Sequence, residues 1–450
     1  MLLPLVAALA ILAPALQATR PAAPAVPAGP YDLSAVDDLL RAELDALQGD
    51  VTVLVRQGDA DLYAFTAGAI APDTKVRLAS LSKTVSAGVI LSLVDAGELT
   101  LDETLAEGLP LLFGGKRTGE ATVLDCWAMR HGLDARLPYE SLPGLGLLAS
   151  VTAIANRAVQ AFAPGTKLHY DGAGMQASAL VATERTGLDW EDLARERILG
   201  PCGMDAADYG QFGKNPAVAG GLRASAREIA AYADMVLAGG KVGDERVLSE
   251  ASVDRLFTDH TAGLPVHGVP FPRTHPDDPD RQAPTYGFGG WIAAKDEATG
   301  RVEEVLGAGA WGSYLWMDRR RGLSAVLVVD LPAGSKGSMD AALGSFRLVR
   351  ETVEAAQASA VVATPVATGA EPSAGEVTLT WTAAPDAEGY RVVGSDAPIE
   401  DVFDLATATT VHAGAGTTTT VPAFAHYAVL ATLAGHENTA LVPGSNVVAP

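Results

Sequence analysis

One stretch, Arg77 to Leu99, constrains this chain more than any other: RLASLSKTVSAGVILSLVDAGEL. Its apolar residues recur at helical spacing, at Val85, Val89 and Leu93. This periodicity predicts an amphipathic helix that packs one face against a core. Ser80 and Lys83 lie three residues apart at its start, and side chains at that spacing are neighbours on a helix. The Lys83 amine can therefore reach the Ser80 hydroxyl.

The Ser80–Lys83 pair admits two interpretations. A serine hydroxyl becomes a good nucleophile when a base takes its proton, and a lysine serves as that base when burial or nearby positive charge lowers the pKa of its amine. The helix start adds positive potential, and the N–H of Ser80 itself is placed to stabilise an oxyanion. In the other interpretation Ser80 only caps the helix and Lys83 is solvated. The motif alone leaves both open, because S-x-x-K arises by chance about once or twice in a chain of this length.

The N-terminal sequence predicts export. Residues 1–18, MLLPLVAALAILAPALQA, form an apolar run that is too short to span a bilayer, which needs about 20 residues. Small residues follow, with Ala18 as the expected cleavage point. We therefore expect a signal peptide at 1–18, a linker at 19–30 and a periplasmic or extracellular protein. No Lys or Arg precedes the run, which leaves an uncleaved membrane anchor as the alternative.

Composition excludes one class of partner. The chain carries a net charge of −22, whereas binding of nucleic acid needs a cluster of Lys and Arg side chains. Hydrophobic residues make up 48% of the 450 residues, which is enough for packed cores in more than one domain. The two cysteines, Cys126 and Cys202, are compatible with a disulfide in an exported protein and also with two small buried residues.

Helical and strand patterns alternate from residue 31 to residue 354, which predicts one mixed α/β (α+β) domain. Strands are expected at 51–58 and 61–68, and again at 311–318 and 322–330 around the basic turn 319–321. Ser225 and Glu228 form a capping box at the start of a helix that ends at Gly239. Residues 263–284, rich in Pro, Asp and His, are expected to be loop.

The composition changes near Ala355, where a linker is expected at 355–365. In the remaining residues, 366–450, apolar side chains alternate with threonines around Trp381, which is the period of a half-buried strand. Short strands with turns between them predict a small β-sandwich. The order of Trp381, GYRVV and HYAVLATLAG resembles a fibronectin type III module. Such modules usually serve as spacers or adhesive units, so we expect a contact with cell-envelope or polysaccharide material.

The sequence ASLSK, the apolar helix and GELTLDETL resemble the serine β-lactamase and penicillin-binding-protein superfamily, in its class C β-lactamase and related esterase branch. Further blocks match in the family's order: ATVLDCWAMRHGLD, PGTKLHYDGAGMQASAL, RERILGPCGM, GGLRASAREIAAYADMVLAGG and GAGAWGSYLWMD. The resemblance covers residues 31–354 and implies an antiparallel sheet flanked by helices, with a helical subdomain. It also implies that Ser80 is the acyl-enzyme nucleophile, Lys83 its base, and Tyr170 the phenol that relays the proton to the leaving group.

Two departures from the family's pattern bear on the substrate. Position 172 is Gly, where the family has the Asn of its Y-x-N motif, whose amide binds the acyl side of the substrate. The third motif, K-T-G or H-x-G, aligns as Gly307–Ala308–Gly309, so its cation is missing; an alignment shifted by three would place Glu304 there. Gly307 and Gly309 are kept, so this strand can still approach a substrate and offer the Ala310 N–H as the second oxyanion donor.

These residues predict a serine hydrolase that acts on small esters or amides and is more esterase-like than an efficient β-lactamase. Loss of the cation weakens recognition of a substrate carboxylate more than recognition of a small ester. A D-amino-acid peptidase or a weak β-lactamase is the alternative among enzymes. A catalytically lapsed binding protein of the cell envelope is the alternative outside them. No metal or organic cofactor is implied.

Overall fold

The computed structural model describes residues 33–269, 285–296, 298–331, 346–347, 349–353, 367–373, 375–384, 387–399, 408–433, 436–437 and 447–449. The expected signal peptide, both expected linkers and most of the expected 263–284 loop lie outside these residues. Part of that loop is described, and there Val266–Gly268 forms the short strand β10, which pairs in parallel with β6 (Leu168–His169).

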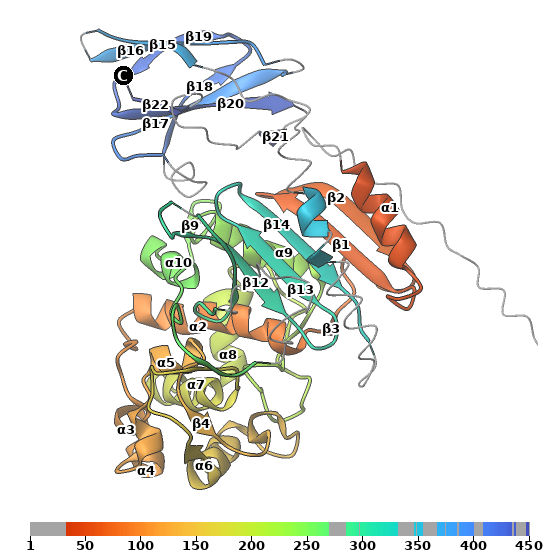
Figure 1. Cartoon of the computed structure of the whole chain (residues 1–450), viewed down its shortest axis with the longest axis vertical. Helices are drawn as coiled ribbons and strands as arrows, with labels where there is room; N and C mark the ends of the chain where they lie inside the picture. The colour runs from red at the N-terminus through yellow and green to blue at the C-terminus, as the bar shows by residue number, and fades with distance from the viewer. Residues whose placement is uncertain are drawn as a thin grey trace, which may run out of the picture.

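A six-stranded antiparallel sheet is the centre of the first domain (Figure 1). Its strands, in spatial order, are β11 (Trp291–Lys295), β12 (Val302–Ala308), β13 (Tyr314–Asp318), β14 (Leu323–Val328), β1 (Val51–Gln57) and β2 (Ala60–Ala67). The expected hairpins are confirmed, because β1 pairs with β2 and β13 pairs with β14. The first and last strands of this sheet in chain order lie side by side, since β1 also pairs with β14 along six residues, Thr52 to Gln57.

Helices cover this sheet and form a second part of the same domain. Near the sheet are α1 (Ser34–Glu43), α9 (Ala226–Leu237) and α10 (Glu250–Leu256). The helical part contains α3 (Leu105–Gly108), α4 (Pro110–Phe113), α5 (Val123–Trp127), α6 (Leu147–Arg157), α7 (Ala173–Thr186) and α8 (Trp190–Ala194). The predicted capping box of α9 is confirmed, with Ser225 and Glu228 bonded reciprocally. The expected fold, an antiparallel sheet with flanking helices and a helical subdomain, is therefore present.

Helix α2 (Ser82–Asp95) lies between the sheet and the helical part (Figure 1). Every residue from Ser82 to Leu93 is buried. The prediction of an amphipathic helix was therefore wrong, because neighbouring elements cover α2 on all sides rather than on one face. Its polar residues instead bond to the surrounding backbone, as when Thr84 donates to the Gly289 carbonyl at 3.1 Å.

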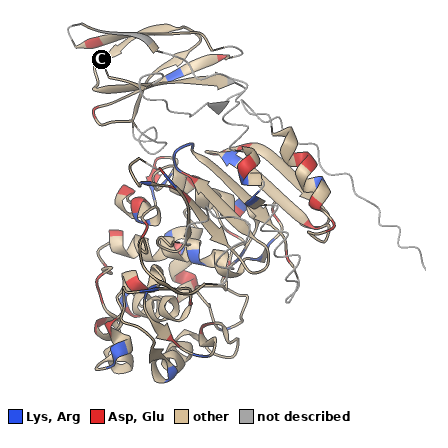
Figure 2. Cartoon of the chain, in the orientation of Figure 1, with Lys and Arg blue, Asp and Glu red and all other residues tan. Residues whose placement is uncertain are grey.

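The C-terminal strands form two small sheets. One has the order β15 (Ala367–Ser373), β16 (Glu376–Trp381), β19 (Thr418–Pro422). The other has the order β18 (Thr409–Gly414), β17 (Gly389–Ser395), β20 (His426–Leu433), β21 (His436–Glu437), with β22 (Val447–Val448) also on β20. The predicted alternation is confirmed, since Val377, Leu379 and Trp381 are buried in a core separate from that of the first domain. Few charged residues lie on these strands, which are mostly tan in Figure 2.

Cys126 and Cys202 are both buried and both free, so the disulfide alternative was wrong. Burial raises the pKa of both thiols, that of Cys202 to about 12. Each behaves as a small apolar residue of the core. Among the described residues, no helix combines the length and the apolar character needed to cross a bilayer.

Candidate functional site

Ser80 lies in the 3-10 turn η1 (Ala79–Leu81), directly before α2. The preceding residue, Ala79, has a φ of 46°, which is a strained conformation for a residue with a side chain. Ser82 holds this turn, because its hydroxyl donates to the Ala79 carbonyl at 2.5 Å and accepts the Leu222 N–H at 3.0 Å. The cap residue of α2 is Leu81, with no side-chain cap bond, so the interpretation of Ser80 as a helix cap is excluded.

Lys83 is 4% exposed and bonds to the nucleophile candidate. Its ammonium donates to Ser80 Oγ at 2.9 Å and to the Ala219 carbonyl at 2.8 Å. A lysine that is this buried is not solvated. The alternative interpretation, a helix-capping Ser80 with a solvated Lys83, is therefore excluded for both residues. The two bonds fix the amine beside the hydroxyl that it would have to deprotonate.

Tyr170 completes the predicted set. Lys83 Nζ lies 4.6 Å from the centre of the Tyr170 ring, within the range of a cation–π contact. The ring stacks on Trp291, with centroids 5.0 Å apart and planes 18° apart, and the Tyr170 N–H donates to the Gly268 carbonyl at 2.8 Å. The structure thus brings Ser80, Lys83 and Tyr170 together from η1, α2 and the segment after β6.

The two glycines of the aligned third motif let β12 approach the nucleophile turn. A Cβ built on Gly309 would lie 2.2 Å from the Leu78 carbonyl oxygen, and one on Gly307 would lie 2.4 Å from Leu81 Cδ1. The Leu78 carbonyl belongs to the backbone and cannot rotate aside, so glycine is required at 309, whereas at 307 the Leu81 side chain would have to shift. Gly309 donates its N–H to the Ser313 carbonyl at 2.8 Å, and Ala310 follows it in an exposed turn.

Glu304 does not take the place of the missing cation, so the shifted alignment was wrong. The carboxylate is 3% exposed and accepts the Trp316 indole N–H at 2.9 Å. It also pairs with Arg350 at 2.9 Å and with Arg321 at 3.6 Å. Glu304 therefore belongs to an ion network at the other end of β12.

His131, which lies between α5 and β4 (Leu133–Asp134), is fully buried. Its Nδ1 accepts the Leu133 N–H at 3.0 Å, which leaves the proton on Nε2, directed at the Asp171 carbonyl 3.4 Å away. A Cβ on Gly174 would lie 2.5 Å from the imidazole. Burial lowers the pKa of His131. This histidine therefore packs against the start of α7 and supports the residue after Tyr170.

Glu140, on the turn η3 (Tyr139–Ser141), is a site residue that the sequence did not indicate. It is half-buried, and a Cβ built on Gly172 would lie 3.0 Å from its Cγ. Burial and the charge of Asp171 raise the pKa of Glu140 to about 7, while the charge of Lys83 acts in the opposite direction. No local pattern marks this residue, because only the fold brings η3 to Gly172.

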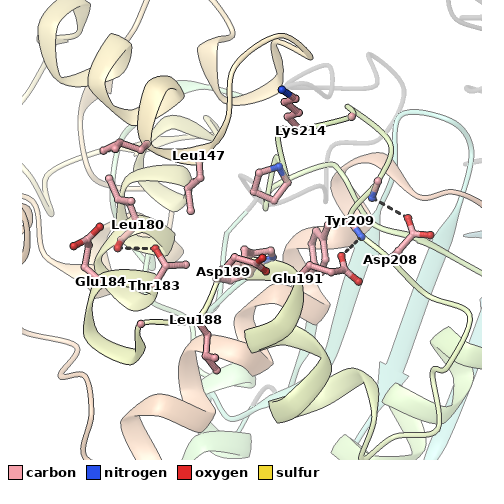
Figure 3. A pocket seen from close by; sticks show the side chains of 16 residues that line it. Leu147, Leu180, Thr183, Glu184, Leu188, Asp189, Glu191, Asp208, Tyr209 and Lys214 are labelled. Atoms are coloured by element: carbon pink, nitrogen blue, oxygen red, sulfur yellow. Dashed lines mark hydrogen bonds between the residues drawn. The ribbon is translucent and has the colours of Figure 1, made fainter.

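A separate cavity of about 800 Å³ lies in the helical part, between α6, α7, α8 and the 208–216 segment (Figure 3). None of Ser80, Lys83 and Tyr170 lines it. Two of its acidic groups have partners, since Glu191 accepts the Tyr209 N–H at 2.7 Å and Asp208 pairs with Arg223 at 2.7 Å. We therefore place the candidate site at Ser80 and not in this cavity. Within the described residues no group of three or more His, Cys, Asp or Glu side chains is arranged to hold a metal ion.

Known proteins match this arrangement. The sequence profile of the Beta-lactamase family matches residues 36–344. The chain belongs to the beta-lactamase family. Penicillin-binding protein 4 of Amycolatopsis lactamdurans is 27% identical over 177 residues, which are 37% of this chain and 46% of that protein. The match thus spans about half the length of this relative.

Solved structures of this beta-lactamase-family fold cover the first domain. A protein of Bacteroides dorei DSM 17855, described as a candidate beta-lactamase, superposes with a TM-score of 0.64 at 26% identity, over 72% of this chain and 99% of that chain. EstCE1, described as a hydrolase with promiscuous acyltransferase activity, gives a TM-score of 0.56 at 16% identity, over 71% and 98% of the two chains. The second likeness shows the fold alone.

Proposed function

We propose that this protein is an exported serine hydrolase that forms an acyl-enzyme on Ser80 and acts on small esters. The bond of 2.9 Å from the buried Lys83 to Ser80 carries the proposal, because it places a base on the nucleophile. In the charged form Lys83 donates this bond. It acts as base after losing one proton, when its lone pair accepts the Ser80 proton instead.

The proposed reaction has two halves. Ser80 Oγ attacks the acyl carbon while its proton moves to Lys83. The carbonyl oxygen becomes an oxyanion, which accepts hydrogen bonds from the N–H groups of Ser80 and Ala310. Collapse of this intermediate expels the alcohol oxygen, which takes a proton through Tyr170. Water then attacks the acyl-enzyme by the reverse path, and Ser80 recovers its proton.

Serine-directed labelling tests this proposal. A fluorophosphonate should add once to the wild type, at Ser80, and not at all to Ser80→Ala, as read by intact mass and peptide mapping. Ser141→Ala, beside the site on η3, serves as the matched control and should label like the wild type. A folded wild type that does not label would favour the lapsed binding protein.

Comparison of two substrates tests the preference for esters. Position 307 is Gly and supplies no cation for a substrate carboxylate, and a Cβ there would require the Leu81 and Thr84 side chains to shift. We therefore expect kcat/KM for a short p-nitrophenyl ester to exceed that for a chromogenic cephalosporin. A higher rate with the cephalosporin would favour the weak β-lactamase, and cleavage of D-amino-acid amides ahead of both would favour the peptidase.

For the C-terminal strands we propose a fibronectin type III-like module that contacts cell-envelope or polysaccharide material. Its two-sheet strand order supports this, as does Tyr427, whose hydroxyl donates to the Pro422 carbonyl at 2.7 Å as in the tyrosine corner of such sandwiches. Threonine hydroxyls also face outward on β16 and β19, where Thr378 bonds Thr420 at 2.9 Å. A chain ending near Pro365 should keep its esterase kcat and lose sedimentation with insoluble polysaccharide. A tenfold fall in kcat would contradict this separation.

A further inference from the structure

The side-chain volume next to Gly172 is occupied by Glu140. Gly172 has φ −88° and ψ −10°, which any residue adopts, so glycine is not required here by the backbone. A Cβ at this position would lie 3.0 Å from Glu140 Cγ, 3.7 Å from its Cδ and 3.1 Å from Ala219 Cβ. Ala219 is also the residue whose carbonyl accepts Lys83. Glu140 therefore stands next to the group that holds the base.

Two buried amides fix this placement. Asn215 Nδ2 donates to the carbonyls of Leu142 at 3.1 Å and Tyr139 at 3.4 Å, the residues that flank Glu140 on η3 and just after it. Gln176 on α7 donates to Asn215 Oδ1 at 2.8 Å and accepts the Val218 N–H at 3.1 Å. Both amide side chains are fully buried. The turn that carries Glu140, the start of α7 and the carbonyl partner of Lys83 are thus bonded into one rigid unit.

The charges around Glu140 favour a cation in the substrate. Asp171, the residue before Gly172, is close enough for its charge to raise the pKa of Glu140. One oxygen of Asp171 accepts the N–H of Ala173, the first residue of α7, at 2.7 Å. Lys83 is the opposing positive group. A substrate group that lies on the Lys83 side of Ser80 therefore meets a corner with two acidic side chains and one basic one.

We propose that Glu140 binds an ammonium group on the acyl part of the substrate, so that this hydrolase prefers acyl groups with a protonated amine next to the scissile carbonyl. The proposal rests on the acyl-enzyme at Ser80. In this proposal Glu140 recognises the acyl part of the substrate, because Gly172 has no side chain that could do so.

An isosteric pair of esters tests this. Phenyl glycinate and phenyl propanoate differ only in an ammonium for a methyl group, and the ratio of their kcat/KM values measures the preference. Glu140→Gln keeps the shape and removes the charge, so this ratio should fall about tenfold or more, the size of a charge-assisted hydrogen bond. Glu184→Gln, on α7 and far from Ser80, makes the same change in net charge and should leave the ratio unaltered. An unchanged ratio in Glu140→Gln would overturn the proposal.

Two further arms separate the explanations. Acetylcholine and 3,3-dimethylbutyl acetate carry the same contrast in the leaving group; a preference there, and not in the acyl pair, would place the cation site elsewhere and contradict the proposal. The double variant Glu140→Ala/Gly172→Asn removes the carboxylate and makes room for an amide, and its ratio should fall as in Glu140→Gln. Fluorophosphonate labelling of each variant reports Ser80 separately. Labelled variants without a change in ratio refute the role of Glu140 alone, whereas an unlabelled wild type refutes the hydrolase itself.

Discussion

Lys83 and Tyr170 face one another, with the ammonium 4.6 Å from the centre of the phenol ring. The charge on Lys83 therefore touches both the Ser80 hydroxyl and an aromatic face. An arginine would keep the charge but would not give up a proton, because its guanidinium stays protonated. We expect Lys83→Arg to lower esterase kcat/KM about 10³-fold, within the range for loss of a general base. Lys75→Arg, an exposed residue paired with Asp208 at 2.7 Å, is the control and should keep full activity.

Tyr170→Phe removes a hydroxyl and keeps the ring. The stacking on Trp291, at 5.0 Å, should survive, so the melting temperature should change little. If the hydroxyl relays the proton, kcat for an ester with a poor leaving group should fall about 10²-fold. An activated leaving group needs less protonation and should show a smaller effect. Tyr63→Phe on β2 is the control and should leave kcat unchanged for both esters. If Tyr170→Phe lowers kcat equally for the two esters, the hydroxyl does not relay the proton.

Gly309→Ala should disturb the site through the backbone. A Cβ there would lie 2.2 Å from the Leu78 carbonyl, two residues before Ser80, and a carbonyl cannot rotate away as a side chain can. We expect a loss of about 1–3 kcal/mol in the free energy of unfolding, together with reduced labelling of Ser80. Gly146→Ala is the matched control, because nothing lies within 4 Å of its added Cβ. Denaturant titration of both variants checks this, and similar midpoints would refute the close approach.

Glu140 should make stability depend on pH. Its folded pKa of about 7 lies above the ordinary value of 4.5, so folding favours the protonated form. The cost of Glu140 is absent below about pH 4.5, when both states are protonated, and grows as pH rises to 7. The melting temperature of Glu140→Gln should therefore be close to that of the wild type at pH 4.5 and about a few degrees higher at pH 8. Asp171 and Lys83, the charges that act on Glu140, are present in both proteins. A difference that does not vary with pH would show that the carboxyl titrates normally.

The thiols should be hidden rather than bridged. Burial raises the pKa of Cys126 and of Cys202, and the thiolate is the reactive form. We expect Ellman's reagent to react slowly with the native protein and with two thiols after unfolding. Reducing agent should leave the melting temperature unchanged. Recovery of a single disulfide-linked peptide pair on non-reducing mapping would contradict the structure.

Local patterns and family resemblance predicted the elements that carry Ser80 and Lys83, because helical spacing and strand alternation are properties of short segments. The same patterns misjudged α2 as amphipathic, since only its neighbours in the fold decide how many faces are covered. Trp291 beneath Tyr170 and the Ala219 carbonyl on Lys83 were also beyond prediction, because each comes from a distant segment. Gly172 was recognised as a departure from the family's motif, but no sequence pattern indicated that Glu140 fills the space beside it.

The Glu140 side chain fills the space beside Gly172, and this limits which single substitutions are tolerated at either position. An asparagine at 172 meets the Glu140 side chain as long as that residue is present, and loss of Glu140 alone leaves neither position 140 nor position 172 with a polar side chain. A library of single substitutions would therefore discard both the loss of Glu140 and the change of Gly172 to Asn, although the two changes are compatible when made together. Recombination of the two positions together offers a route between amine-selective and amide-lined versions of the same site, which a selection for altered acyl preference could follow.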